Sequence, residues 1–242
     1  MKPSLTIPVT LSTVALAGVL LVHAAAGTGT YTTAFTRTEN PLSESGQWAG
    51  GRSTGANLWG DVRTTPGFAF GVDEPTQFGD PTAILTGSWG PNQTVEGTVK
   101  IRTTPTRTCC HEIELRLRAT ISPNSITGYE AYCSTMPDYP YCHIARWNGP
   151  NGSYCNLDPT PPALYVVNGD VLKATATGTN PVVVTLYRNG AQILQISDTG
   201  ANCSPGGPAG PFRTGNPGIG FYDDHDSKWA DFGLSTFTAT AR

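Results

Sequence analysis

The sequence predicts an all-β fold, a two-sheet antiparallel β-sandwich, from three observations. Short segments that alternate apolar and polar residues recur along the chain between Gly- and Pro-rich turns, as is typical of antiparallel sheets. The composition, with 28 Gly, 20 Pro and 14% charged residues, disfavours long helices. The clearest pattern, residues 169–200, predicts a three-stranded meander whose second turn is Asn189-Gly190. That dipeptide suits the positive φ angles of a type I′ turn.

Residues 1–26 have the features of a signal peptide and not of a folded element. Lys2 supplies a positive start, residues 11–22 an apolar stretch, and residues 24–26 a small-residue cleavage site. The apolar stretch is short for a membrane span, although an uncleaved anchor is the alternative. We therefore expect a secreted, extracellular monomer, with residues 27–242 forming one domain and no membrane segment after cleavage.

The charge pattern excludes two classes of partner. The formal net charge is −3, and no run of Lys or Arg occurs in the sequence. Nucleic acids and anionic membrane surfaces are bound through clustered basic residues, so neither is an expected partner.

The cysteines predict disulfide bonds. All six lie outside the leader, and an even number in an exported protein favours bridges, whereas no Cys-x-x-Cys pair supports zinc. Cys133 and Cys142 flank a short Pro-containing loop and form the expected pair. Two adjacent cysteines should have different partners, which leaves two connectivities open among the remaining four: Cys109, Cys110, Cys155 and Cys203.

Outside the meander, alternation predicts further strands at residues 82–88, 93–102, 111–120, 128–134 and 142–147, and two more within residues 218–241. If the strands between residues 111 and 147 are straight members of one sheet, their side chains divide into two faces. The apolar face carries Ile113, Leu115, Leu117, Ala119, Ala131 and Ile144. The other carries Glu112, Glu114, Arg116, Arg118, Glu130, Tyr132, His143 and Trp147. A single bulge would exchange the faces on its strand.

The order of these segments resembles the concanavalin A-like lectin/glucanase superfamily, including its laminin G-like members. The matching pieces are F-x-R-x-x-x-P-L, E-x-E-L-R-L-R, G-Y-E…I-A-R-W-N-G, G-D-V-L-K-A…L-Y-R-N-G and P-G-I-G-F-Y…A-D-F-G-L-S-T-F-T-A-T. They span most of residues 31–240, while residues 49–110 match poorly. The resemblance implies a jelly-roll of two curved sheets whose concave face holds a saccharide. It also implies a structural calcium ion near Asp231, before the last strand.

Glu112 and Glu114 are the candidate catalytic pair. Two residues apart on a strand, they lie about 6.5–7 Å apart on one face, near the carboxylate separation of inverting glycosidases. Superfamily members that hydrolyse β-glucans carry Glu-x-Asp-x-x-Glu, and Leu117 stands where the last Glu would be. The alternative is a structural role, in which these two carboxylates lie on a solvent-exposed strand face and neutralise Arg116 and Arg118.

We expect the polar face to bind a polysaccharide or glycan, because aromatic rings stack on sugars while fixed polar groups read their hydroxyls. Trp147 is equally well explained as a core residue. The alternatives are a glycoside hydrolase using the two glutamates, a polysaccharide lyase with His143 or Tyr132 as base, and a structural or adhesive surface module. The predicted carbohydrate-binding residues are Glu114, Arg116, Glu130, Tyr132, His143 and Trp147.

Overall fold

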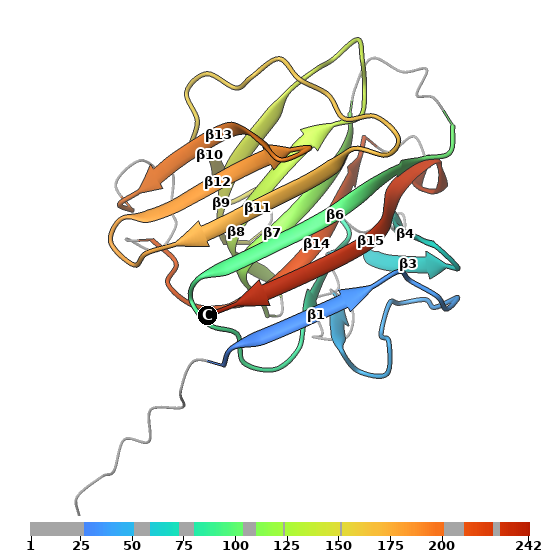
Figure 1. Cartoon of the computed structure of the whole chain (residues 1–242), viewed down its shortest axis with the longest axis horizontal. Coiled ribbons are helices and arrows are strands. Elements are labelled where there is room, and N and C mark those ends of the chain that lie inside the picture. The colour runs from blue at the N-terminus through green and yellow to red at the C-terminus, as the bar shows by residue number, and fades with distance from the viewer. Residues whose placement is uncertain are drawn as a thin grey trace, which may run out of the picture.

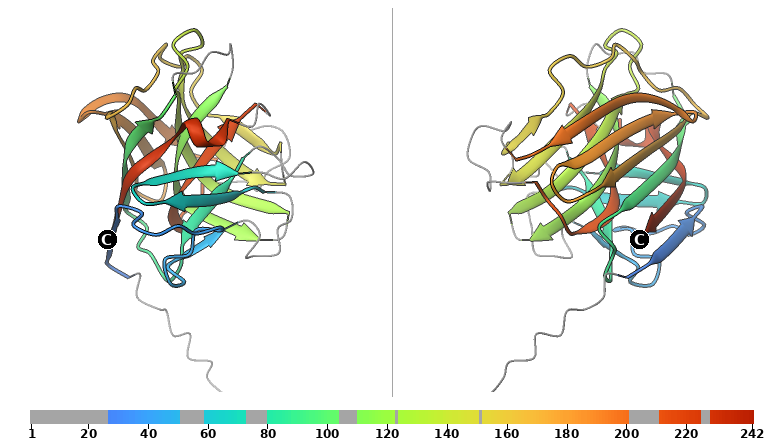
Figure 2. Two further views of the ribbon diagram at one scale, coloured as in Figure 1. Left: turned by 90° about the vertical axis from the view of Figure 1, so that its right-hand side faces the viewer. Right: turned by 60° about the vertical axis from the view of Figure 1, so that its left-hand side comes forward.

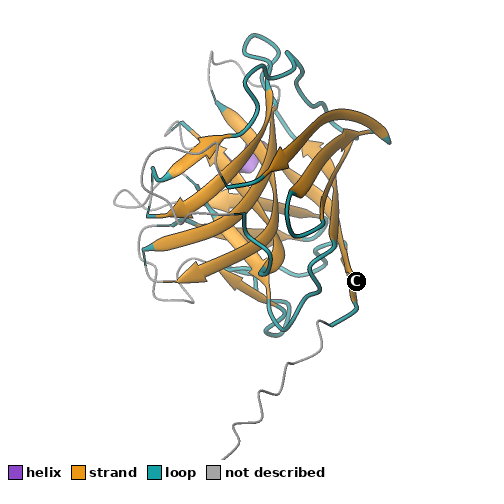
Figure 3. Cartoon of the chain, turned by 90° about the vertical axis from the view of Figure 1, so that its left-hand side faces the viewer, coloured by secondary structure: helices purple, strands orange, loops and turns teal. Residues whose placement is uncertain are grey.

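The computed structural model describes residues 27–50, 59–72, 80–103, 110–122, 124–150, 152–200, 211–224 and 228–242. The predicted leader lies outside these residues. Two antiparallel sheets face each other across an apolar core, and apart from one short 3₁₀ helix the described elements are strands (Figures 1 and 3). The predicted all-β, two-sheet antiparallel sandwich is therefore confirmed. None of the described helices is long and apolar enough to cross a membrane.

Sheet A lies at the front in Figure 1 and runs in the order β13-β12-β11-β6-β15-β4-β3, with β1 also pairing with β15. Its strands are β1 (Gly29–Thr33), β3 (Asp61–Thr65), β4 (Phe68–Val72), β6 (Gln93–Ile101), β11 (Val171–Thr177), β12 (Val182–Arg188), β13 (Ala191–Asp198) and β15 (Phe232–Ala241).

Sheet B lies behind it and runs in the order β10-β9-β8-β7-β14-β5-β2. Its strands are β2 (Trp48–Gly50), β5 (Thr82–Leu85), β7 (His111–Ser122), β8 (Ser125–Ser134), β9 (Cys142–Gly149), β10 (Tyr154–Asn156) and β14 (Asn216–Asp223). The 3₁₀ helix η2 (Trp229–Asp231) leads into β15.

The predicted meander is present as β11, β12 and β13. The strands pair consecutively and antiparallel, and the turn residues Asn189 and Gly190 have φ angles of 51° and 81°. Both angles are positive, as the type I′ turn requires.

The two-face prediction for β7, β8 and β9 holds over most of its length. Ile113, Leu115 and Leu117 are buried in the core between the sheets, together with Ala131 and Ile144 from the neighbouring strands. The register places Glu114 opposite Tyr132, and Tyr132 opposite His143. The polar residues of β7 before Arg118 therefore share the outer face of sheet B with their partners on β8 and β9.

A bulge in β7 ends this pattern at Arg118. The pairing of β7 with β8 shifts between Leu117 and Thr120, and Arg118 has a φ angle of 51°. The guanidinium of Arg118 instead donates to the carbonyl groups of Pro91, Phe212 and Gly178. Placing Arg118 on the outer face and Ala119 in the main core was therefore wrong, because the extra residue exchanges the faces.

The ends of the described chain pair with each other. β1 runs antiparallel to β15, with Gly29 opposite Ala241. Figure 2 shows these two strands side by side at the edge where the C-terminus lies.

Candidate functional site

The centre of the outer face of sheet B holds a buried charge cluster around Arg116. This residue and Glu130 stand opposite each other on β7 and β8 and form an ion pair. Nη2 of Arg116 lies 2.5 Å from Glu114 Oε2 and 2.5 Å from Asp80 Oδ1. One guanidinium thus contacts three carboxylates, from two strands and the segment before β5. Sequence reasoning missed Asp80, which lies 36 positions from Arg116.

The carboxylates of this cluster have raised pKa values. Burial is the main cause in each case: it raises the pKa of Glu130 to about 7 and also raises those of Glu114 and Asp80. The positive charge of Arg116 opposes this shift at all three carboxyls. A single cation facing three buried acids favours retention of protons in the folded state.

The same three carboxylates have the donor chemistry of a cation site. One ligand oxygen from each of Asp80, Glu114 and Glu130 lies within 4.8 Å of the others. Arg116, however, already lies among them at hydrogen-bonding distance and supplies the positive charge that an ion would bring. The predicted calcium residue, Asp231, is not part of this group. It lies in η2, where its carbonyl oxygen accepts bonds from Arg102 and Thr103, and calcium there stays a prediction.

Trp147 is buried on the same face and is no exposed stacking platform. Its side chain is 4% exposed and belongs to a second apolar cluster with Trp59, whose ring meets it edge to face at 5.1 Å. Its Nε1–H donates to Glu130. The prediction of a solvent-accessible face was therefore wrong for five of its residues, which are buried because residues distant in sequence pack over them: Glu114, Arg116, Glu130, Tyr132 and Trp147.

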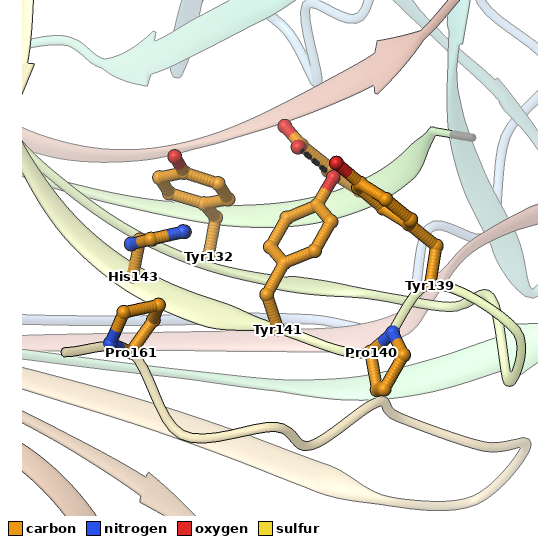
Figure 4. A pocket seen from close by; sticks show the side chains of 7 residues that line it. Tyr132, Tyr139, Pro140, Tyr141, His143 and Pro161 are labelled. Atoms are coloured by element: carbon orange, nitrogen blue, oxygen red, sulfur yellow. Dashed lines mark hydrogen bonds between the residues drawn. The ribbon is translucent and has the colours of Figure 1, made fainter.

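The exposed part of this face is an open pocket of about 470 Å³, next to the point where β8 and β9 are joined. It is lined by Glu112, Tyr132, Tyr139, Pro140, Tyr141, His143 and Pro161. Figure 4 shows Tyr141 standing between Tyr132 and Tyr139, with His143 next to Tyr132. The structure thus brings together three predicted site residues, Glu112, Tyr132 and His143, and separates them from the buried Glu114.

The sequence prediction missed two tyrosines of this pocket, Tyr139 and Tyr141. They lie in the loop closed by the disulfide between Cys133 and Cys142, whose S–S distance is 2.05 Å. This disulfide confirms the predicted pairing of the two cysteines. The signal was present in the sequence as Tyr-Pro-Tyr-Cys, aromatic residues in a short Cys-bounded loop. Cys110 and Cys155 are also disulfide-bonded. Cys109 and Cys203 lie outside the described residues, so the two alternative connectivities stay predictions.

The polar groups of the pocket are held in place by neighbours. Glu112 accepts a hydrogen bond from the Tyr141 hydroxyl, drawn as a dashed line in Figure 4, and burial raises its pKa to about 8. His143 Nδ1 lies 2.8 Å from an oxygen of Asp158. The Tyr132 hydroxyl donates to Asn156 at 3.0 Å. The arrangement presents fixed polar groups among aromatic faces, the composition of a small-molecule site.

No protein-family model matches this sequence, and neither does any curated protein. Solved structures do resemble it. The carbohydrate-binding module CBM66 from Bacillus subtilis aligns with 83% of this chain and 96% of its own, at 14% identity and a TM-score of 0.50. β-Agarase A from Zobellia galactanivorans aligns with 93% and 97%, at 12% identity and a TM-score of 0.51.

A xylan β-1,4-xylosidase from Bacillus halodurans aligns with 86% of this chain, at 12% identity and a TM-score of 0.52, but over only 38% of its own length. These likenesses establish the fold: the chain has the concanavalin A-like jelly-roll fold that the sequence resemblance implied. These three similar structures come from proteins named for binding or acting on carbohydrates.

Proposed function

We propose that this protein is an exported carbohydrate-binding jelly-roll protein that holds a segment of a polysaccharide or glycan in the tyrosine pocket, defined by Glu112, Tyr132, Tyr139, Tyr141 and His143. The observation that carries the proposal is the pocket itself. Three tyrosine rings and an imidazole surround an opening on the outer face of sheet B, beside a carboxyl group. Aromatic faces stack on the C–H faces of sugar rings, and the fixed polar groups accept and donate to hydroxyls.

The size and openness of the pocket support this reading. Its volume of about 470 Å³ lies within the ~300–1,000 Å³ typical of ligand sites. The Tyr139 side chain is 50% exposed, so a stacking surface is available without rearrangement of the core. The fold is consistent with this role, because the similar structures include a carbohydrate-binding module.

Export is supported by two observations. Residues 1–26 have the pattern of a cleavable leader. The Cys133–Cys142 bridge, with further bonded cysteines at positions 110 and 155, suits an oxidising compartment. The location is tested by recovering the processed protein from the culture medium of the producing cell.

The binding test uses the folded protein and a panel of soluble glycans, including β-glucan, xylan, and oligomers of N-acetylglucosamine and of glucosamine, measured by calorimetry. Tyr139→Ala should weaken binding of the best glycan by about tenfold, since it removes one stacking ring. The matched control is Tyr187→Ala, a half-buried tyrosine on β12 of sheet A, which should bind as the parent does. Absence of binding to every glycan, or equal binding by Tyr139→Ala, refutes the proposal.

One observation favours a second candidate, an enzyme acting in the same pocket. Asp158 contacts His143 Nδ1 and so fixes the orientation of the imidazole. In many enzymes a carboxylate orients a histidine that acts as a general base in the same way. A polysaccharide lyase or glycoside hydrolase would generate unsaturated products or reducing ends from a bound glycan, and His143→Ala would abolish them. Binding without product favours the binding protein. Silence in both assays favours a structural or adhesive module.

A further inference from the structure

The Tyr141 ring of the pocket stands nearly perpendicular to the rings of Tyr132 and Tyr139. The rings of Tyr132 and Tyr141 are 6.1 Å apart with an interplanar angle of 79°, and those of Tyr139 and Tyr141 are 5.5 Å apart at 85°. Figure 4 shows Tyr141 between these two neighbours. His143 adds a fourth ring, 5.3 Å from Tyr132 and 5.5 Å from Tyr141. The geometry is that of an open aromatic cage.

The ionisable groups around this cage are mainly acidic, and a cation bound beside them favours their ionised forms. Glu112 lines it directly, and Asp158 stands behind His143. The charge cluster lies next to it on the same face, since Glu114 is opposite Tyr132 in the register. Its three carboxylates outnumber its one guanidinium, and Arg116 is fully buried among them. Among the described lining residues of the pocket there is no Lys or Arg.

An aromatic cage with a carboxylate in its wall is complementary to an organic cation. The electron-rich face of each ring attracts a positive charge, and an ammonium group held among several such faces loses water while keeping favourable contacts. A uronate lacks this complementarity, because the quadrupole of the ring faces repels an anion and no Lys or Arg is among the described lining residues. The pocket therefore favours cationic over anionic sugars.

We propose that the tyrosine pocket recognises the ammonium group of an amino sugar, with the rings of Tyr132, Tyr139 and Tyr141 around the cation and Glu112 as its counter-ion. This inference rests on the proposed function and specifies its substrate class: a glycan that contains free, non-acetylated amino groups. In this arrangement the hydroxyls of the same sugar form hydrogen bonds with His143 and with groups at the rim of the pocket.

The test compares two probes of equal length and linkage, a β-1,4-linked glucosamine tetramer and its fully N-acetylated counterpart, by calorimetry at constant ionic strength. The intact protein should bind the glucosamine tetramer at least about tenfold more tightly. Glu112→Gln keeps an acceptor for the Tyr141 hydroxyl but removes the carboxyl group that can ionise beside a bound ammonium group. It should abolish the preference while retaining the affinity for the acetylated tetramer.

The matched control is Glu96→Gln, an exposed glutamate on β6 of sheet A, which should keep the full preference and so exclude a general charge effect. Tyr139→Ala serves as the second pocket variant, because that half-exposed side chain can be truncated without loss of core packing. It should reduce binding of the amine more than binding of the acetylated tetramer.

Each outcome separates this inference from the function on which it rests. Equal affinity for the two tetramers, or a preference that survives Glu112→Gln, overturns the ammonium site and leaves glycan binding intact. Binding of free choline or of a trimethyllysine peptide without binding of either tetramer overturns it as well, by assigning the cage to a different cation. No binding of any glycan refutes the proposed function itself.

Discussion

The indole Nε1–H of Trp147 on β9 donates a hydrogen bond to the carboxylate of Glu130 on β8, and both side chains are buried. The bond connects the charge cluster to the second apolar cluster, so the polar and apolar halves of this face depend on each other. We therefore expect Trp147→Ala to destabilise the protein by about 3–5 kcal/mol, measured by chemical denaturation, because it removes a large buried ring and leaves Glu130 without its donor.

The control for this variant is Tyr154→Ala. Tyr154 contacts the ring of Trp147 at 4.9 Å, but its side chain is 46% exposed. Its removal should cost no more than about 1 kcal/mol. If Trp147→Ala were as stable as Tyr154→Ala, Trp147 would not be the buried anchor described here.

The charge cluster predicts that stability falls as the pH rises through neutrality. Burial raises the pKa of Glu130 from its ordinary value of 4.5 to about 7, so the folded state binds a proton that the unfolded state releases. This contribution is present below about pH 4.5 and is lost between about pH 4.5 and 7. Denaturation midpoints should therefore decrease from pH 5 to pH 8, and Glu130→Gln should reduce the decrease.

Glu130→Gln keeps an oxygen that accepts the hydrogen bond from Trp147. Its effect on the pH dependence of stability therefore reflects the loss of the titrating carboxyl group and not the loss of this hydrogen bond. Glu96→Gln, on the exposed side of sheet A, should leave the pH profile unchanged. A midpoint that increases between pH 5 and 8 in the parent protein would show that Arg116 keeps the carboxylates ionised.

Gly220 on β14 lies directly beneath the cluster, and we expect Gly220→Ala to be destabilising by about 1–3 kcal/mol. An added Cβ would lie 2.1 Å from Glu114 Oε2 and 2.9 Å from Arg116 Nη2, and these atoms are held in place by their ion pairs. Gly50→Ala in β2 is the control, because its Cβ would meet no atom closer than 3.5 Å. Equal stability of the two variants, measured by thermal unfolding, would mean that the cluster can move aside.

The Cys133–Cys142 bridge should affect both stability and binding. Replacing both cysteines with Ser should lower the free energy of unfolding by about 2–4 kcal/mol, and it frees the loop that carries Tyr139 and Tyr141. We expect glycan affinity to fall even at temperatures where the variant is fully folded, because the rings must then be ordered on binding. A folded variant with unchanged affinity would show that the tyrosines are positioned without the bridge.

The strands and their faces could be predicted from the sequence because period-2 alternation is a local property. It identified Ile113, Leu115 and Leu117 as core residues and Glu112 and Tyr132 as neighbours on the outer face. The bulge at Arg118 carries no local signal in HEIELRLRAT. Burial was also beyond local reasoning, since Asp80 reaches Arg116 across 36 positions and Trp59 packs on Trp147 from still further away. An alternating Glu/Arg pattern therefore indicated solvent where the structure has a buried network.

The pairing of β1 with β15 has a consequence for engineering. Because Gly29 stands opposite Ala241, the two ends of the described chain lie one strand apart, and a short flexible linker can join them. New ends could then be opened at the Asn189-Gly190 turn, between β12 and β13, without removing any residue that pairs in the sheet. Such a circular permutant keeps every strand neighbour while moving its attachment point to the opposite side of sheet A, so the pocket can be presented in a chosen orientation on a surface or a fusion partner.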